Sequence, residues 1–262
     1  MTDQIIYTKI KNLRLFTQVI GTGEPLLFLH GWGASAVSYQ KLINALSKNY
    51  LVYAPHLPCF GYSQSLKTEI TFENYMSVMT ELFKTFREEK FIGVGHSFGG
   101  AVLSRLVVKF PEKFSHLYLV DSAGFPFPRR TLSEWIKRFR TNGSKNIVKM
   151  YHKGIFSAVI GDFLLTSLSL KKVYDLALMI TQLDLRSVFA KIKVPTTIIW
   201  GAKDLTFPVA KGKEIHRLIA GSEFYVLRKV DHIWCAIHPE KLVKILKQHK
   251  KQLVKTSQES II

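Results

Sequence analysis

Short apolar runs rich in β-branched and aromatic residues recur along the chain, and longer stretches with apolar residues at helical spacing separate them. This alternation is typical of an α/β protein with a largely parallel sheet. Only Lys11 and Asn12 separate the first two runs, which predicts that these two strands pair antiparallel. Eight strands are expected, at residues 5–10, 13–20, 26–30, 50–55, 91–95, 117–121, 196–201 and 223–228. Helices are expected at residues 39–47, 72–88, 98–110, 208–219 and 241–255.

The alternation is interrupted once, between the sixth and seventh expected strands. The interruption opens with GFPFPRR, whose glycine and prolines indicate a turn and a chain reversal. Helical patterns follow at residues 132–140, 144–153 and 173–183. We therefore predict a core domain formed by residues 1–124 and 191–262, with a helical insertion at residues 125–190 after the sixth strand.

The length and composition agree with one large folded domain. In 262 residues, 47% are hydrophobic and 21% are charged, which is enough apolar material for a full core. The N-terminal segment lacks the pattern of a secretory signal, and the most apolar later stretch, residues 155–170, is too short to span a bilayer and contains Asp162. Two cysteines do not form a disulfide framework. These features predict a cytoplasmic protein without stable membrane anchoring.

The net charge is unusually high, at +18 from 37 basic and 19 acidic residues. Such a charge can attract nucleic acid or an anionic membrane. The basic residues are scattered, however, and the densest group, at residues 241–255, has apolar residues near helical spacing. We interpret that group as a last helix with a basic outer face, and we expect no nucleic-acid partner.

The clearest chemical signal is a serine between an expected strand and an expected helix. The sequence GHSFG at residues 95–99 follows the apolar run FIGV and precedes an apolar helical pattern, which is the setting that the G-x-S-x-G turn requires. Glycines around Ser97 allow the sharp, strained turn that exposes such a serine at the carboxyl edge of a sheet. We predict that Ser97 is a nucleophile.

A serine nucleophile needs a base and an acid that orients the base, in the chain order serine, acid, histidine. Asp204 follows the seventh strand in a glycine-bearing loop, and Asp121, at the end of the sixth strand, is its main rival. VDHIWCAIHPE at residues 230–240 offers two histidines. His232 directly follows the last strand and is the predicted base, whereas His238 precedes Pro239 and is interpreted as a helix-start residue.

Two backbone N–H groups are the predicted oxyanion donors. Phe98 begins the helix after the serine, and Trp32 lies in the glycine-rich loop HGWG at residues 30–33. His30 ends a buried strand, so we expect it to hydrogen-bond neighbouring loops rather than act as a base.

The chain resembles the α/β-hydrolase superfamily, close to its esterase and carbon-carbon hydrolase branches. HGWG, GHSFGG, LYLVDSAG, VPTTIIWGAKD and DHIWCAIHPE occur in family order over nearly the whole chain. The resemblance implies the α/β-hydrolase fold, an eight-stranded mostly parallel sheet with helices on both faces. It also implies that the inserted helices form a lid whose apolar side chains shape an acyl or alcohol pocket.

Two departures from the family pattern affect the loops beside this site. Relatives often read D-L-P-G-F-G where this chain has His56, Leu57, Pro58, Cys59, Phe60 and Gly61, so this loop is expected to differ in shape. A small thiol filling a turn explains Cys59 without a catalytic role. Relatives also often have glycine where this chain has Asp231, whose carboxylate can compete for the ring N–H of His232.

The leading hypothesis is a serine hydrolase that cleaves a small-molecule carboxylic ester with a Ser97, Asp204 and His232 triad. Neither a metal nor an organic cofactor is expected. The alternatives are a hydrolase of a carbon-carbon bond in a diketone-type compound and a ligand-binding protein that keeps the fold without turnover.

Overall fold

Eight strands form one sheet in the order β1-β2-β4-β3-β5-β6-β7-β8. The computed structural model describes residues 2–126 and 170–248. β1 pairs antiparallel with β2 and β2 antiparallel with β4, while every later pair is parallel. The predicted strands are confirmed, and their bounds are β1 (Thr2–Ile10), β2 (Leu13–Gly21), β3 (Glu24–Leu29), β4 (Tyr50–Pro55), β5 (Phe91–His96), β6 (Phe114–Val120), β7 (Thr196–Gly201) and β8 (Glu223–Leu227).

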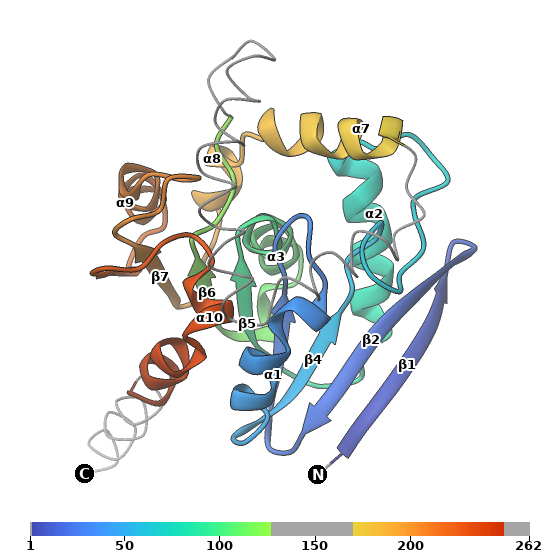
Figure 1. Ribbon diagram of the computed structural model, residues 1–262, viewed down its shortest axis with the longest axis horizontal. Coiled ribbons are helices and arrows are strands. Elements are labelled where there is room, and N and C mark those ends of the chain that lie inside the picture. Colours follow the sequence, from blue (N-terminus) through green and yellow to red (C-terminus); the bar gives the residue numbers. More distant parts are fainter. Residues whose placement is uncertain (1, 127–169, 249–262) are drawn as a thin grey trace.

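The predicted hairpin turn joins β1 to β2. Lys11 and Asn12 both have positive φ angles, of 47° and 63°, and Ile10 pairs with Leu13. Two successive residues with positive φ make the tight turn whose twist matches that of antiparallel strands. The hairpin leaves β1 at one edge of the sheet (Figure 1).

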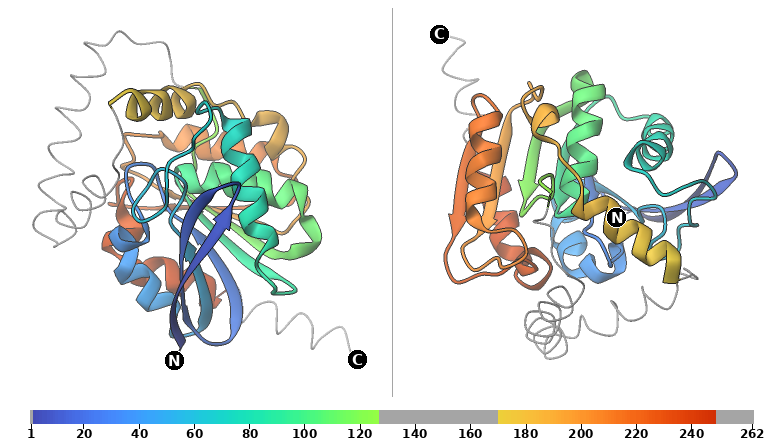
Figure 2. Two further views of the ribbon diagram at one scale, coloured as in Figure 1. Left: turned by 90° about the vertical axis from the view of Figure 1, so that its right-hand side faces the viewer. Right: turned by 90° about the horizontal axis from the view of Figure 1, so that it is seen from above.

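Helices cover both faces of the sheet, as expected, and a separate hydrophobic cluster fills each side (Figures 1 and 2). The larger cluster includes side chains of α2 (Phe72–Lys84), α3 (Phe98–Lys109) and α9 (Val209–Leu218). The smaller one includes α1 (Gln40–Leu46), α10 (Trp234–Ile237) and the helical residues 239–248. Short 3-10 helices, η1 (Ala36–Tyr39) and η2 (Pro111–Lys113), precede α1 and β6.

α2 ends four residues earlier than the pattern predicts. The hydroxyl of Thr85 donates to the carbonyl oxygen of Leu82 at 2.7 Å, which occupies an oxygen at the end of the helix. Phe86 then packs with its ring centroid 5.1 Å from that of Tyr53, on the neighbouring strand β4. A tertiary contact therefore competes with the good helix formers that follow.

The insertion between β6 and β7 contains α7 (Leu170–Thr181) and α8 (Arg186–Phe189). α7 confirms the helix expected at residues 173–183, while those expected at residues 132–140 and 144–153 lie outside the described residues. Buried Leu176 and Ile180 join α7 to the larger cluster, and the N–H of Leu185 donates to Gly124 at 2.8 Å. α7 crosses the side toward which the parallel strands point (Figure 1).

Within the described parts of the chain, no helix combines the length and the apolar character needed to cross a membrane.

Candidate active site

Ser97 occupies a strained turn between β5 and α3. Its φ and ψ are 53° and −119°, a combination that few residues other than glycine adopt. Its N–H donates to Val120 at 2.9 Å, and its carbonyl oxygen accepts from Gly100 and Ala123, both at 3.0 Å. Such strain costs about 1–3 kcal/mol and persists only where surrounding contacts enforce it. These bonds to the end of β6 and the segment after it hold the turn in place.

Close packing of the turn explains why glycines flank the serine. A Cβ atom on Gly99 would lie 2.1 Å from the carbonyl oxygen of Leu29, and one on Gly95 would lie 2.6 Å from the Cα atom of Gly100. Any side chain at either position would push α3 away from β3 or open the turn.

The structure brings Ser97, His232 and Asp204 into one hydrogen-bonded chain. His232 Nε2 lies 3.0 Å from Ser97 Oγ, and His232 Nδ1 lies 2.7 Å from Asp204 Oδ2. Because an ionised carboxylate only accepts, Nδ1 carries the proton and donates to Asp204. The lone pair of Nε2 is then free to accept the hydroxyl proton of Ser97. This is the tautomer that a general base requires.

Asp204 is held from two sides in the loop after β7. Its Oδ1 atom accepts from the backbone N–H groups of Thr206 at 2.7 Å and Phe207 at 2.9 Å, which leaves Oδ2 for His232. The side chain of Asp204 has no exposed surface, and that of His232 is 12% exposed. A charge-assisted hydrogen bond in such a shielded setting fixes the ring strongly.

Asp121, the rival acid, is engaged elsewhere. Its Oδ1 atom accepts from the N–H of Gly201 at 2.7 Å, and its Oδ2 atom accepts from the indole N–H of Trp234 at 2.6 Å. Burial, together with the nearby charge of Asp204, raises the pKa of Asp121 well above its usual value. Asp121 therefore joins Gly201, at the end of β7, to Trp234, at the start of α10, and both Asp204 and His232 lie between those two residues in the chain.

The two predicted oxyanion donors lie in the expected places along the chain. Phe98 is the first residue of α3, where a backbone N–H has no acceptor within its own helix. Trp32 lies in the loop after β3. This loop passes close to the serine: a Cβ atom built on Gly31 would be 3.3 Å from the Cβ atom of Ser97. Their assignment as donors remains a prediction.

His30 supports this loop, as expected. Its Nδ1 atom donates to the carbonyl oxygen of Gly31 at 2.8 Å, and its Nε2 atom accepts from the N–H of Leu57 at 2.9 Å. Burial lowers the pKa of His30 to about 4, so the ring stays neutral at physiological pH. It ties the loop after β3 to the loop after β4.

The loop that departs from the family pattern is organised around His56. The Nδ1 atom of His56 accepts from the N–H of Tyr62 at 3.0 Å, and a Cβ atom on Gly61 would collide with that nitrogen at 2.2 Å. Cys59 is buried with a φ of 74°, and burial raises the pKa of its thiol. Burial, the turn conformation and the raised pKa agree with the turn-filling role predicted for Cys59.

Asp231 and His238 lie on either side of His232 in the segment 230–240. The backbone carbonyl oxygen of Asp231 accepts from the N–H of Trp234 at 3.3 Å, in the turn that leads into α10. His238 lies between α10 and the helical residues 239–248, and its Nδ1 atom is 3.5 Å from Glu240. This position agrees with the predicted helix-start role of His238.

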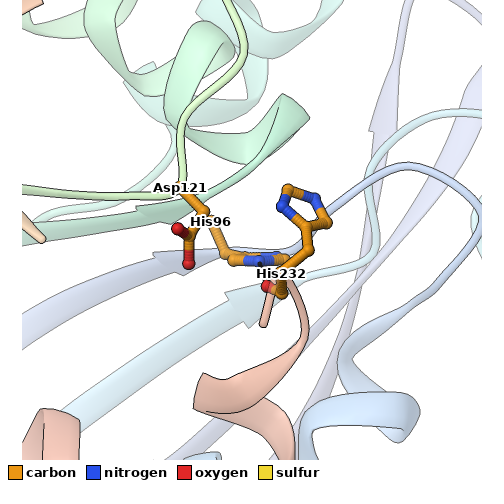
Figure 3. A group of neighbouring side chains, drawn as sticks. All are labelled: His96, Asp121 and His232. Atoms are coloured by element: carbon orange, nitrogen blue, oxygen red, sulfur yellow. Dashed lines mark hydrogen bonds between the residues drawn. The ribbon is translucent and has the colours of Figure 1, made fainter. Parts of the chain in front are cut away.

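Figure 3 shows the side chains of His96, Asp121 and His232 close to one another. One potential metal-ligand atom from each lies within 4.8 Å of the others. Asp121 already accepts two hydrogen bonds, His232 bonds to Asp204 and Ser97, and both ring nitrogens of His96 have partners. The cluster is therefore better described as hydrogen-bonded support than as a vacant set of ligands. The motif GHSFG contains His96 but does not by itself predict a role for this residue.

The chain was compared with known proteins. A family model described as the alpha/beta hydrolase fold matches residues 24–149. The uncharacterised hydrolase YugF of Bacillus subtilis (strain 168) is 24% identical over 252 residues, which cover 88% of this chain and 90% of YugF. The pimeloyl-(acyl-carrier protein) methyl ester esterase of Wigglesworthia glossinidia brevipalpis is 25% identical over 214 residues, 74% of this chain and 80% of that protein.

The structure was also compared with solved structures. A crystal structure of a serine hydrolase involved in carbazole degradation superposes with a TM-score of 0.79 at 19% identity. The superposition covers 96% of this chain and 100% of that hydrolase. Together with the family model, this superposition confirms the fold predicted from the motifs.

Proposed function

We propose, from the premise that the chain has the α/β-hydrolase fold, that it is a serine hydrolase of carboxylic esters. One observation carries the proposal: Ser97, on a strained turn, is joined to His232 and through it to buried Asp204. A hydroxyl, an imidazole and a carboxylate in this order are what nucleophilic acyl transfer needs.

The reaction would run through an acyl-enzyme. His232 Nε2 takes the proton of Ser97 as Oγ attacks the ester carbonyl carbon, and Asp204 stabilises the imidazolium that forms. The N–H groups of Trp32 and Phe98 stabilise the oxyanion, where one such donor is worth about 3 kcal/mol. The imidazolium protonates the departing alcohol, and the same steps with water release the acid. These side chains and backbone groups suffice for the reaction as written.

Similarity gives this proposal its substrate class. The relative from Wigglesworthia is named as a methyl ester esterase, so a small ester is the first substrate to test. The carbon-carbon alternative is kept as a second outcome of the same test.

The test is a panel of p-nitrophenyl esters of increasing acyl length together with a diketone, assayed with the wild-type chain and with Ser97→Ala. We expect turnover on at least one ester and a loss of at least about 10³-fold in kcat for Ser97→Ala, because the nucleophile is absent. Ser104→Ala is the matched control. Ser104 is a buried serine on α3, the helix that follows Ser97, and its hydroxyl donates back to Gly100 at 2.8 Å, so this variant should keep wild-type activity.

Absence of Ser97-dependent turnover on every ester would overturn the ester proposal. Turnover of a diketone that also requires Ser97, without turnover of any ester, would favour the carbon-carbon alternative. Tight binding of such compounds with no turnover at all would favour the ligand-binding alternative.

A further inference from the structure

His96 precedes Ser97 in the chain, but its side chain contacts the backbone of the residue that carries the base. His96 Nε2 lies 2.8 Å from the carbonyl oxygen of His232, and His96 Nδ1 lies 2.7 Å from the hydroxyl of Tyr39. The side chain is buried, with 2% of the residue exposed. One short pair, Tyr39 with His96, thus links η1 and the end of β5 to the loop after β8.

The partners determine which atoms carry protons. A carbonyl oxygen only accepts, so His96 Nε2 must donate to His232. In a neutral ring the other nitrogen, Nδ1, is then an acceptor, and the hydroxyl of Tyr39 donates to it. Every polar atom of the ring is satisfied in one tautomer only. The pair is therefore fixed in direction as well as in place.

The surroundings of the pair leave it little freedom to move. A Cβ atom on Gly31 would lie 3.1 Å from His96 Nδ1 and 3.2 Å from the Tyr39 hydroxyl, so the backbone of the loop after β3 packs directly on this hydrogen bond. The ring centroids of His96 and His232 are 4.9 Å apart. A lone rotation of His96 would collide with one of these neighbours.

His96 also stays neutral beside a ring that must become charged. Burial, aided by the nearby His232, lowers the pKa of His96 to about 3. The charged and titratable groups that face His96 include Tyr39 from η1, His232 from the loop after β8, Asp121 from the end of β6, and His30 from the end of β3. A neutral His96 adds no repulsion when His232 takes up a proton.

We propose that His96, held by Tyr39, is a positioning residue for His232. This inference rests on the proposed function, since it assigns His232 the role of the base. His232 lies outside regular secondary structure, between β8 and α10, so no backbone ladder holds its Cα atom. The bond from His96 to its carbonyl oxygen supplies that restraint, while Asp204 orients the ring.

The physical reason is that proton transfer requires a short and nearly constant distance between the two groups. The serine hydroxyl and the imidazole must stay within hydrogen-bond reach while the ring moves from the nucleophile toward the leaving group. A misplacement of about 1 Å can lower the rate by about 10²-fold. A restraint on the carbonyl oxygen of His232 keeps the ring within this range without touching the substrate. Its loss should therefore lower kcat and leave KM nearly unchanged.

The experiment compares His96→Leu, His96→Gln and Tyr39→Phe in the full chain, on the best p-nitrophenyl ester. We expect His96→Leu to lower kcat by about 10- to 100-fold with KM within about twofold. His96→Gln places an amide N–H near the position of Nε2 and should recover most of that loss. Tyr39→Phe, which removes only the hydroxyl, should fall between His96→Leu and the wild type.

His116→Leu is the matched control, because it removes another buried histidine, on the neighbouring strand β6, whose Nε2 atom contacts Thr197. It should keep wild-type kcat. Unfolding curves for all variants show whether a loss of activity follows a loss of folded protein. If His96→Leu and Tyr39→Phe both unfold, His96→Gln alone decides, with retained kcat expected.

Two results would overturn the inference. One is wild-type kcat in folded His96→Leu; the other is an equal loss of kcat in His96→Leu and His96→Gln, which would indicate packing rather than a donated hydrogen bond. Failure of the proposed function is distinguishable, because the wild-type chain would then show no Ser97-dependent turnover.

Discussion

Two buried aspartates, Asp121 and Asp204, follow neighbouring strands of the sheet, and both fit the acid position in chain order. The sequence predicts Asp204 as the acid and leaves Asp121 as its rival. The structure separates them by their partners: Asp204 contacts the imidazole of His232, whereas Asp121 accepts from a backbone amide and the indole of Trp234. Both residues are aspartates, so only their different hydrogen-bond partners distinguish them.

This difference predicts different results from one substitution. Asp204→Asn should lower kcat by about 10⁴-fold, because an amide favours the wrong tautomer of His232. Asp121→Asn should lower kcat far less but reduce the free energy of unfolding by about 1–3 kcal/mol, since the amide nitrogen cannot accept from Gly201 or Trp234. Steady-state kinetics and urea unfolding measure both quantities. Equal losses of kcat in the two variants would contradict this division.

At the scale of elements, the position of the serine depends on how closely α3 packs on β3. Gly99, in the first turn of α3, lies against the carbonyl oxygen of Leu29, at the end of β3. The G-x-S-x-G pattern predicted small residues here, and the strand, turn and helix around them were predictable from hydrophobic periodicity. The end of α2 was not predictable in this way, because the ring of Phe86 packs on Tyr53, a residue of another element.

Gly99→Ala is expected to reduce both stability and activity. The new Cβ atom must move the helix or the strand, which typically costs about 1–3 kcal/mol, and it displaces Ser97 relative to His232. Gly221→Ala is the control: Gly221 has a φ of 70° but open space around it, so it should lose about 1 kcal/mol and keep full kcat. Unfolding curves and the ester assay make the comparison. Wild-type activity in Gly99→Ala would show that the close approach is not needed.

At the scale of the whole molecule, three buried histidines make the fold sensitive to acid. Burial lowers the pKa of His30 to about 4, and that of His56 and of His96 to about 3, below the value of 6.5 for an unfolded histidine. Between these values the unfolded chain binds more protons than the folded one. The contribution of these three histidines to the free energy of unfolding is therefore fully present above about pH 6.5. It is lost as the pH falls toward the pKa values of the folded state.

His56→Asn tests this pH dependence. The amide oxygen of asparagine can replace Nδ1 as the acceptor for Tyr62 without titrating. Below pH 6.5, each buried histidine contributes a slope of up to about 1.4 kcal/mol per pH unit, so the variant should lose one such contribution. Urea unfolding at pH 8 and at pH 5 gives the difference for each protein. An unchanged difference in His56→Asn would remove His56 from this account.

The sequence by itself determined the alternation of strands and helices, and it predicts the place of the insertion and the order of serine, acid and histidine. These features follow from local periodicity and from short motifs, which involve residues close together in the chain. Only the tertiary structure decided which aspartate contacts His232, which tautomer that ring adopts, and that His96 holds its carbonyl oxygen. Ser97 and His232 are separated by 135 positions, and His96 and His232 by 136. Contacts over such separations depend on the order in which β5, β6, β7 and β8 pair in the sheet, which no local pattern specifies.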